Sequence, residues 1–373
     1  MNLLQRHIFA SVLFSCAVAA GIFTFVLIVG SAFRDLLGYM LAGQLTPEVF
    51  TQLILLLVPS VGIHALPIGM LTGVLLVLGR MSAQQEITAM RAAGLGLGYV
   101  ARPILLIAVV GVGLSMALNF YLMPQARTLS RTILNNAVRK NPLSMIVEKT
   151  FVRDFPNMVI YAGQKNGGDL TDVWLWRLDK QKRVTEFMHA KSAHADYDED
   201  ANVLKVVLFD TFSDRRNPNS LETFTNTDGQ GSMGEVPLDI SLDTIFGQHT
   251  ANKKASNFTL GELLEKRARL ARENATVSER MKVSVALNEK SADSFAILAF
   301  TLLAIPLGIK ISRKETSANL GIALLMTLSY YFINVMVSWL DRSPALRPDL
   351  WLWLSPVLFI GVGIWMFRRV ERI

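Results

Sequence analysis

Long uncharged stretches dominate the pattern of polar and apolar positions along this chain. A helix needs about 20 apolar residues to cross a hydrocarbon core that is ~30 Å thick. Six stretches lack Asp, Glu, Lys and Arg, and five of them are long enough to predict spans directly. The sixth has 16 residues and can span only if the side chain of Asp293 or Lys310 reaches toward the interface. The six stretches are residues 8–33, 49–79, 103–124, 294–309, 316–340 and 350–367. We therefore expect six transmembrane helices.

Between the third and fourth stretches the pattern changes to a period of two. Segments that alternate or run apolar over the length of a strand are separated by turns rich in Gly, Asp and Asn. The expected strands are residues 159–163, 172–179, 184–190, 192–198 and 202–210. Regular short strands of this kind predict an antiparallel β-sandwich or jelly roll. Helices are expected on either side of it, over residues 125–141 and 259–293.

Together these patterns predict an α-helical membrane protein with six transmembrane helices, three on each side of an inserted antiparallel β-sandwich or jelly-roll domain. The expected parts are residues 1–124, 125–292 and 293–373. Basic residues in short loops mark the cytoplasmic side of a membrane protein. If the N-terminus is inside, the inside segments hold ten Lys and Arg and three acids, against three basic and four acidic residues in the short outside loops. We therefore expect both termini in the cytoplasm and the inserted domain outside it.

A short polar segment separates the second and third stretches. It contains "SAQQEITAMRAAG", in which Ala83, Ile87 and Met90 recur at helical spacing, with Glu86 and Arg91 beside them. The pattern predicts a helix over about residues 82–93 that ends at Gly94. The apolar stripe is narrow for binding to lipid. A helix of this size between spans is typical of transporter permeases that insert it into a cleft of a separate ATPase.

Two features inside the second stretch merit attention. Gly69 and Gly73 are four residues apart, a spacing that lets two helix backbones approach closely in lipid. His64 lies near the middle of the stretch, where a polar group is costly. A hydrogen bond to a neighbouring helix is the favoured interpretation of His64, and a proton relay or a substrate contact is the alternative.

Candidate chemistry elsewhere in the sequence is sparse. His189 and His194 are five residues apart on expected strands, which directs them to opposite faces and makes them a poor pair of metal ligands. No phosphate-binding loop of the type GxxxxGK[ST] occurs, and no catalytic residue, metal ligand or cofactor is expected. The net charge of +7 comes from the cytoplasmic loops, because region 124–293 holds 24 Lys and Arg and 23 Asp and Glu. Binding to nucleic acid therefore has no support.

The segment "LPIGMLTGVLLVLGRMSAQQEITAMRAAG" resembles the signature of the LptF/LptG lipopolysaccharide-export permeases, also called the YjgP/YjgQ family. "LLAIPLGI" (302–309) and "LWLWLSPVLFIGVGIWMFRR" (350–369) resemble the fourth and sixth spans of the same family. The second span is slightly more similar to LptF. The family commonly has an Arg and then a Pro before the fourth span, whereas this chain has Lys290 and Ser294.

The resemblance implies an inner-membrane permease that hydrolyses nothing itself and exports lipopolysaccharide or a similar large glycolipid. Its implied partners are a cytoplasmic LptB-like ATPase dimer, a second six-span permease of the family and a single-span, periplasmic LptC-like protein. Glu86 would engage the ATPase, with Ile87, Met90 and Arg91 packed beside it, and Arg34 would contact the lipid's phosphates. Two other classes remain open. One is an ATPase-driven mechanotransmitter that moves a periplasmic domain without carrying lipid. The other is an ion-coupled transporter, which would need acids inside its spans.

Overall fold

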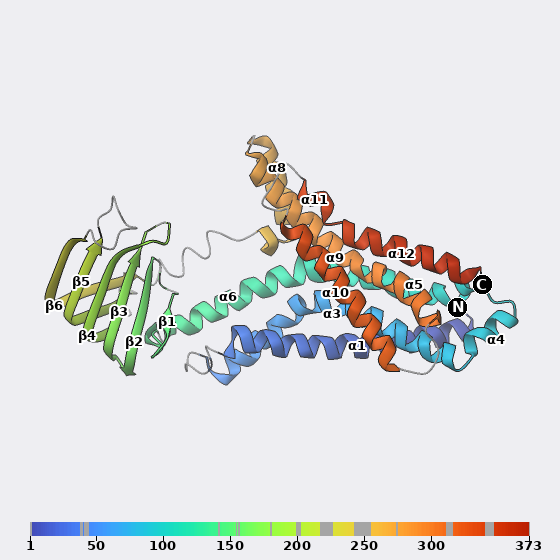
Figure 1. Cartoon of the computed structure of the whole chain (residues 1–373), viewed down its shortest axis with the longest axis horizontal. Helices are drawn as coiled ribbons and strands as arrows, with labels where there is room; N and C mark the ends of the chain where they lie inside the picture. The colour runs from blue at the N-terminus through green and yellow to red at the C-terminus, as the bar shows by residue number, and fades with distance from the viewer. Residues whose placement is uncertain are drawn as a thin grey trace. The chain divides into compact units, whose positions relative to one another are not determined.

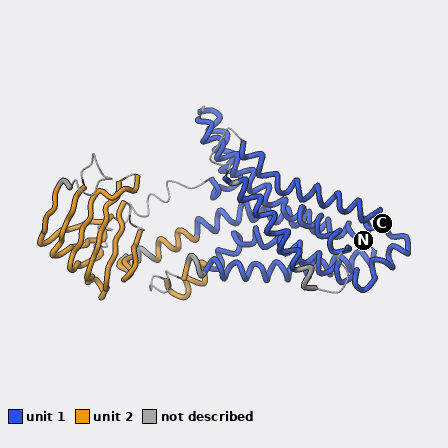
Figure 2. Tube along the Cα trace, in the orientation of Figure 1, with its two compact units in different colours: residues 1–33, 54–129, 254–373 blue, residues 34–53, 130–253 orange. Residues whose placement is uncertain are grey.

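The computed structural model describes most of the chain as two compact units. The described residues are 2–37, 40, 45–140, 142–153, 155, 157–179, 181–198, 203–216, 227–241, 255–273, 275–310, 316–339 and 347–372. Unit 1 comprises residues 1–33, 54–129 and 254–373, and unit 2 comprises residues 34–53 and 130–253 (Figure 2). Unit 1 is helical, and unit 2 contains a β-sheet, as Figure 1 shows.

Helices with long apolar stretches build unit 1 (Figure 1). Among the described residues, five helical runs are long and apolar enough to cross a membrane: Leu3–Ala32, Pro47–Ala83, Leu97–Ala137, Val277–Lys310 and Pro348–Glu371. A shorter apolar run, Gly321–Val337, lies within a further helix. The helical elements are α1 (Leu3–Asp35), α3 (Pro47–Ala83), α4 (Glu86–Ala92), α5 (Leu97–Ala117), the π-helix η1 (Leu118–Leu122), α6 (Met123–Lys140), the 3₁₀-helix η3 (Ala255–Asn257), α8 (Leu260–Arg272), α9 (Val277–Lys310), α10 (Thr316–Ser338), α11 (Pro348–Trp351) and α12 (Leu354–Glu371).

Small residues bring α1 and α3 into close contact. A Cβ atom added at Gly69 would lie 2.6 Å from the backbone nitrogen of Ala20, and one added at Gly73 would lie 2.6 Å from the Cα atom of Cys16. No side chain fits at such distances, so glycine at both positions is what allows the two backbones to meet. The prediction from the spacing of Gly69 and Gly73 is therefore confirmed.

The centre of unit 1 lies around α9, which packs against α5 and α12. Phe300 of α9 meets Tyr330 of α10 and Phe359 of α12 edge to face, with ring centroids 4.9 and 5.9 Å apart. All three side chains are buried. Edge-to-face pairs of this kind fix the relative rotation of the helices beyond what apolar burial achieves.

In the described part of unit 2, six strands form an antiparallel sheet in which strands adjacent in sequence are neighbours. The elements of this unit are the 3₁₀-helix η2 (Pro142–Met145) and strands β1 (Phe151–Val152), β2 (Met158–Asn166), β3 (Asp169–Leu178), β4 (Val184–Asp198), β5 (Val203–Arg216) and β6 (Thr227–Ser241). The described strands thus form a meander without a Greek-key crossing. Antiparallel pairing agrees with the expectation, but two expected strands, 184–190 and 192–198, are the single strand β4.

A shared irregularity explains why β4 looked like two strands. Every ladder from β2 to β6 omits the pair at one row, formed by Gly163, Asp172, Lys191, Asp210 and Gly234. Asp172 and Asp210 have left-handed backbones, with φ of 53° and 50°. We call this row the crease. The pairing register is the same on both sides of the crease, so all five strands share the irregularity, and one residue out of the regular alternation in each strand exchanges the inward and outward positions beyond it.

Burial on either side of the crease shows the reversal. In a regular strand, residues three apart face opposite sides. Nevertheless Leu170 and Val173 are both buried, as are Ala190 and Ala193. The apolar inner face of the sheet therefore continues across the crease, where it packs with Met145 of η2.

Candidate functional site

Helix α4 begins and ends through specific backbone conformations. Gln85 adopts a left-handed backbone (φ 57°), which turns the chain sharply after α3. At the other end Gly94 has φ +81°, Leu95 N–H donates to the Met90 carbonyl at 3.0 Å, and Gly94 N–H donates to the Arg91 carbonyl at 3.0 Å. This is a Schellman motif, which requires the residue that Gly94 supplies. Glycine ends the helix where the sequence predicts, and α4 is a separate seven-residue helix.

The two sides of α4 differ in character. Ile87 and Met90 are buried in the core of unit 1, in the same cluster as Ile8. Glu86 and Arg91 are exposed. The apolar side chains therefore hold the helix against the bundle, and the charged ones are left available for a partner. The expected apolar stripe includes Ile87 and Met90 but not Ala83, which is exposed and completes α3.

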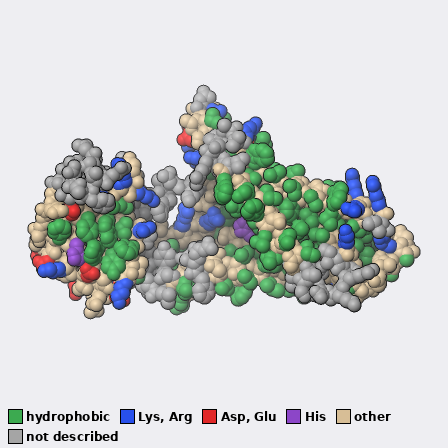
Figure 3. All heavy atoms as spheres, in the orientation of Figure 1, with side chains coloured by type: hydrophobic (Ala, Val, Ile, Leu, Met, Phe, Trp, Pro, Cys, Tyr) green, Lys and Arg blue, Asp and Glu red, His purple; other side chains and the backbone are tan. Residues whose placement is uncertain are grey.

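One end of unit 1 carries α4 together with both chain termini (Figure 1). Basic side chains gather at this end of the unit in the face that Figure 3 shows. Ser82, just before α4, donates a hydrogen bond from its hydroxyl to the carbonyl of Ile309 in α9 at 2.9 Å. The end of α3, just before α4, is thereby tied to the helix at the centre of the bundle.

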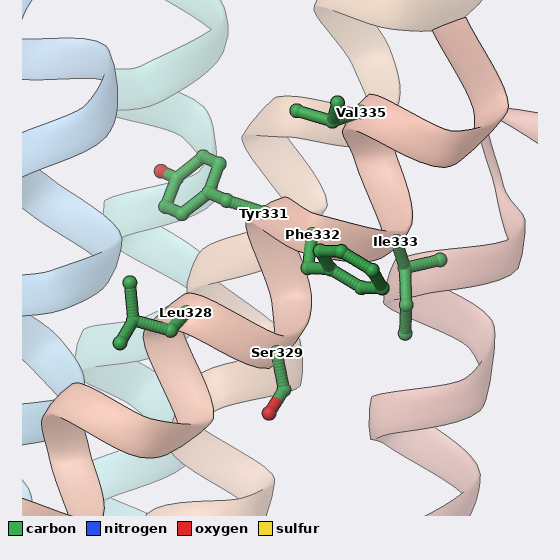
Figure 4. Close-up of a pocket in the computed structure, with 6 residues that line it drawn as sticks. All are labelled: Leu328, Ser329, Tyr331, Phe332, Ile333 and Val335. Carbon is green, nitrogen blue, oxygen red and sulfur yellow. The ribbon is translucent and has the colours of Figure 1, made fainter. Parts of the chain in front are cut away.

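An exposed apolar surface lies along α10. Leu324, Leu328 and Phe332 are each more than half exposed. A shallow groove of about 590 Å³ is lined by six α10 residues: Leu328, Ser329, Tyr331, Phe332, Ile333 and Val335. Figure 4 shows Tyr331 and Ile333 projecting to opposite sides of this helix. Helix α1 carries a similar exposed surface that includes Phe14, Ile22 and Phe25.

His64 meets α10 at this surface. Its Nδ1 atom lies 3.4 Å from the Tyr331 hydroxyl, and the two rings pack edge to face with centroids 5.7 Å apart. The favoured interpretation of His64, a hydrogen bond to a neighbouring helix, is therefore confirmed. The sequence pattern gave no signal for Tyr331, because the partner lies 267 residues away.

Arg34, the expected contact of the lipid's phosphates, follows the first span in the sequence. Arg34 lies in the last turn of α1, and its side chain is outside the described part of the chain. Another basic residue is better defined: Arg127 of α6 donates to the side-chain oxygen of Asn257 in η3 at 2.9 Å.

His189 and His194 lie on one face of the sheet, contrary to the expectation. The crease between them reverses the alternation, so both face away from the apolar inner side. His189 Nε2 lies 2.9 Å from the carboxylate of Asp172, and His194 Nδ1 lies 2.6 Å from that of Asp169. The hydrogen bonds from His189 and then Trp174 hold the pKa of Asp172 below its ordinary value. Among the described residues, no three His, Cys, Asp or Glu side chains gather where they could hold a metal ion.

Membrane-length helices, a short helix seated at one end and an antiparallel sheet inserted between the third and fourth spans define a multi-pass membrane protein of the transporter type. A model of the family described as "Lipopolysaccharide export system permease LptF/LptG" matches residues 6–369. Similar proteins include the lipopolysaccharide export system permease protein LptG of Escherichia coli (strain K12), 24% identical over 312 residues and covering 81% of each chain. LptF of the same strain is 21% identical over 331 residues, covering 88% of this chain and 85% of LptF. The chain belongs to the LptF/LptG family, which confirms the resemblance.

Proposed function

We propose that this protein is the permease subunit of an ATP-driven exporter that takes lipopolysaccharide from the inner membrane and passes it toward the outer membrane. The observation that carries the proposal is the family match over residues 6–369, which includes the spans, the α4 helix and the sheet. The protein is a transport subunit, and a separate LptB-like ATPase dimer hydrolyses the ATP.

The proposal includes six spans, with α10 as the fifth. Both termini and α4 then lie in the cytoplasm, and the sheet lies in the periplasm. The ten Lys and Arg residues of the inside segments, against three in the short outside loops, support this orientation. Helix α10 carries an apolar run over Gly321–Val337, which is short for a span and would need local thinning of the bilayer or flanking side chains that reach the interface.

In this proposal α4 couples the permease to the ATPase. Glu86 and Arg91 contact the ATPase because they are exposed. Ile87 and Met90 transmit the movement because they are buried in the bundle. An exposed helix with two buried anchors behaves as a rigid lever, since moving it without moving the core would expose both apolar side chains.

The exposed apolar surfaces of α1 and α10 are proposed to face the lipid and the second permease of the family. Lipopolysaccharide enters between the two permeases, with Arg34 near its phosphates. The apolar inner face of the unit 2 sheet then receives the acyl chains and passes them to a periplasmic LptC-like protein. Support for this last step is the continuous apolar face, which holds Ile160, Leu175 and Leu204.

Purification of the protein from its native membrane in mild detergent tests the proposal. We expect mass spectrometry to find an ABC ATPase, a second permease of the family and bound lipid A. Reconstituted in vesicles with these partners, the complex should release lipopolysaccharide to a soluble acceptor only when ATP is present. An ATPase that copurifies while no lipopolysaccharide is bound or released would instead support a mechanotransmitter.

A further inference from the structure

Lys290 of α9 is a cation in the interior of unit 1. Only 3% of its surface is exposed. Its ammonium donates to the carbonyl of Asn119 at 3.1 Å and to the carbonyl of Phe258 at 2.7 Å. It also lies 5.6 Å from the ring centre of Phe120. Two of its three donors therefore serve backbone oxygens on two other segments, the π-helix η1 and the residue that follows η3.

The sequence explains why the Asn119 carbonyl needs a donor. In the π-helix each N–H bonds to the carbonyl five residues earlier, and Met123 N–H accordingly donates to Leu118. The next donor in this register, for the carbonyl of Asn119, would come from residue 124. That residue is Pro124, which has no N–H. Lys290 thus stands where the missing backbone donor would be.

The side chain of Asn119 ties the same place to α9 a second time. Its amide donates to the Ser294 hydroxyl at 3.2 Å, and that hydroxyl donates to the carbonyl of Lys290 at 2.9 Å. Asn119 and Ser294 are 2% and 0% exposed. A buried polar network in which each member has a partner fixes one arrangement, because losing any member leaves a desolvated group without one.

We propose that Lys290 is a positioning residue that replaces the missing Pro124 N–H and so fixes the angle at which α6 leaves α5. Helix α6 continues from unit 1 into unit 2 at residue 130. We call η1 and its contacts with Lys290 and Ser294 the joint. The joint ties the central helix α9 to α6, the helix that leads along the chain to the sheet. An effect of Lys290 on lipopolysaccharide transport rests on the proposed function, whereas its effect on the angle between α5 and α6 does not.

Spin labels on either side of the joint test the structural part in the full-length protein. Val110 and Leu129 are exposed, and a straight helix would separate them by about 28 Å, a distance that pulsed electron resonance measures. Replacement of Cys16, the one cysteine, leaves only the introduced labels. We expect Lys290→Met to broaden the distance distribution and Lys290→Arg to restore it.

A second-site variant makes the test specific. Pro124→Ala supplies an N–H at residue 124, so Lys290→Met with Pro124→Ala should recover the narrow distribution. Lys290→Met with Pro103→Ala, which adds an N–H elsewhere in α5, should keep the broad distribution. Lys282→Met, on the exposed side of α9, is the matched loss of a lysine and should leave the distribution unchanged.

Lipopolysaccharide release by the reconstituted complex tests the role in transport. We expect Lys290→Met to lower ATP-dependent release about fivefold while the protein inserts normally, and both restoring variants to recover most of it. Wild-type release and a wild-type distance distribution in Lys290→Met would overturn the inference, as would a double variant that stays as defective as Lys290→Met. If the wild-type complex itself releases no lipopolysaccharide while the distance distributions change as expected, the proposed function is wrong and the positioning role of Lys290 is still supported.

Discussion

Gly73 of α3 lies against the backbone of Cys16 in α1, so closely that an added Cβ would come within 2.6 Å of it. Real Cβ atoms do not tolerate that distance, and two of the three nearest atoms, the N and Cα of Cys16, belong to backbone, which cannot rotate away. The contact holds the first two spans together where lipid offers no hydrophobic force to do so.

Gly73→Ala should therefore force α1 and α3 apart. Overpacking of this kind costs about 1–3 kcal/mol, which thermal unfolding in detergent will report as a lower melting temperature. Gly21→Ala is the matched control, because nothing lies within 4 Å of a Cβ at Gly21. Equal melting temperatures for both variants would contradict the close contact.

Mutations on the exposed side of α4 should impair transport, whereas mutations on its buried side should impair stability. Glu86→Ala removes an exposed charge, so the protein should insert and melt normally while ATP-dependent lipopolysaccharide release is lost. Ile87→Ala removes a buried side chain and should destabilise the fold by about 2–4 kcal/mol. Membrane protein levels, melting temperature and release are measured for each. Wild-type release by Glu86→Ala would exclude its coupling role.

His64 should be dispensable as a proton carrier. His64→Gln keeps a side chain that can bond the Tyr331 hydroxyl, and His64→Leu does not. We expect His64→Gln to export lipopolysaccharide at the wild-type rate at every pH near neutrality. His64→Leu should lose only about 0.6 kcal/mol of stability, the average for a hydrogen bond between membrane helices. A loss of export in His64→Gln with normal stability would instead favour a relay.

The stability of unit 2 should depend on pH through Asp172. Its carboxyl has a pKa below the ordinary value, because His189 and Trp174 stabilise the charged form. The resulting stabilisation is present above the pKa of the unfolded chain and is lost as the pH falls through the folded pKa. Asp172→Asn should therefore melt at a lower temperature than wild type at neutral pH, and the difference should shrink in acid. A difference that stays constant with pH would contradict this.

Most of the membrane spans and the end of α4 were predictable from the sequence. Uncharged runs gave the spans of α1, α3, α5, α9 and α12, and the place of glycine gave the end of α4. These features are local, because helix length, burial in lipid and capping each depend on residues close together in the chain. The motif around α4 was also enough to identify the family.

The crease was not predictable, because period-two reasoning assumes an unbroken alternation. The alternation of faces reverses at the crease in β4 as in its neighbours, so β4 looked like two strands and His189 and His194 were expected on opposite faces. Among the described strands, a left-handed backbone marks the crease only in β3 and β5, at Asp172 and Asp210. Asp adopts a left-handed backbone more readily than most residues. Asp is also common in turns and at solvated positions, so its presence does not predict the crease. Only pairing across five strands shows that the irregular residues share one row.

The sequence by itself therefore determined the class, the spans, the inserted sheet and the exposed charges of α4. The tertiary structure decided which long-range partners meet: His64 with Tyr331, Gly73 with Cys16, and Lys290 with Asn119. The physical reason is that local patterns fix which face of an element is apolar. Which distant element then covers that face, or supplies the donor that Pro124 lacks, depends on how the helices pack together.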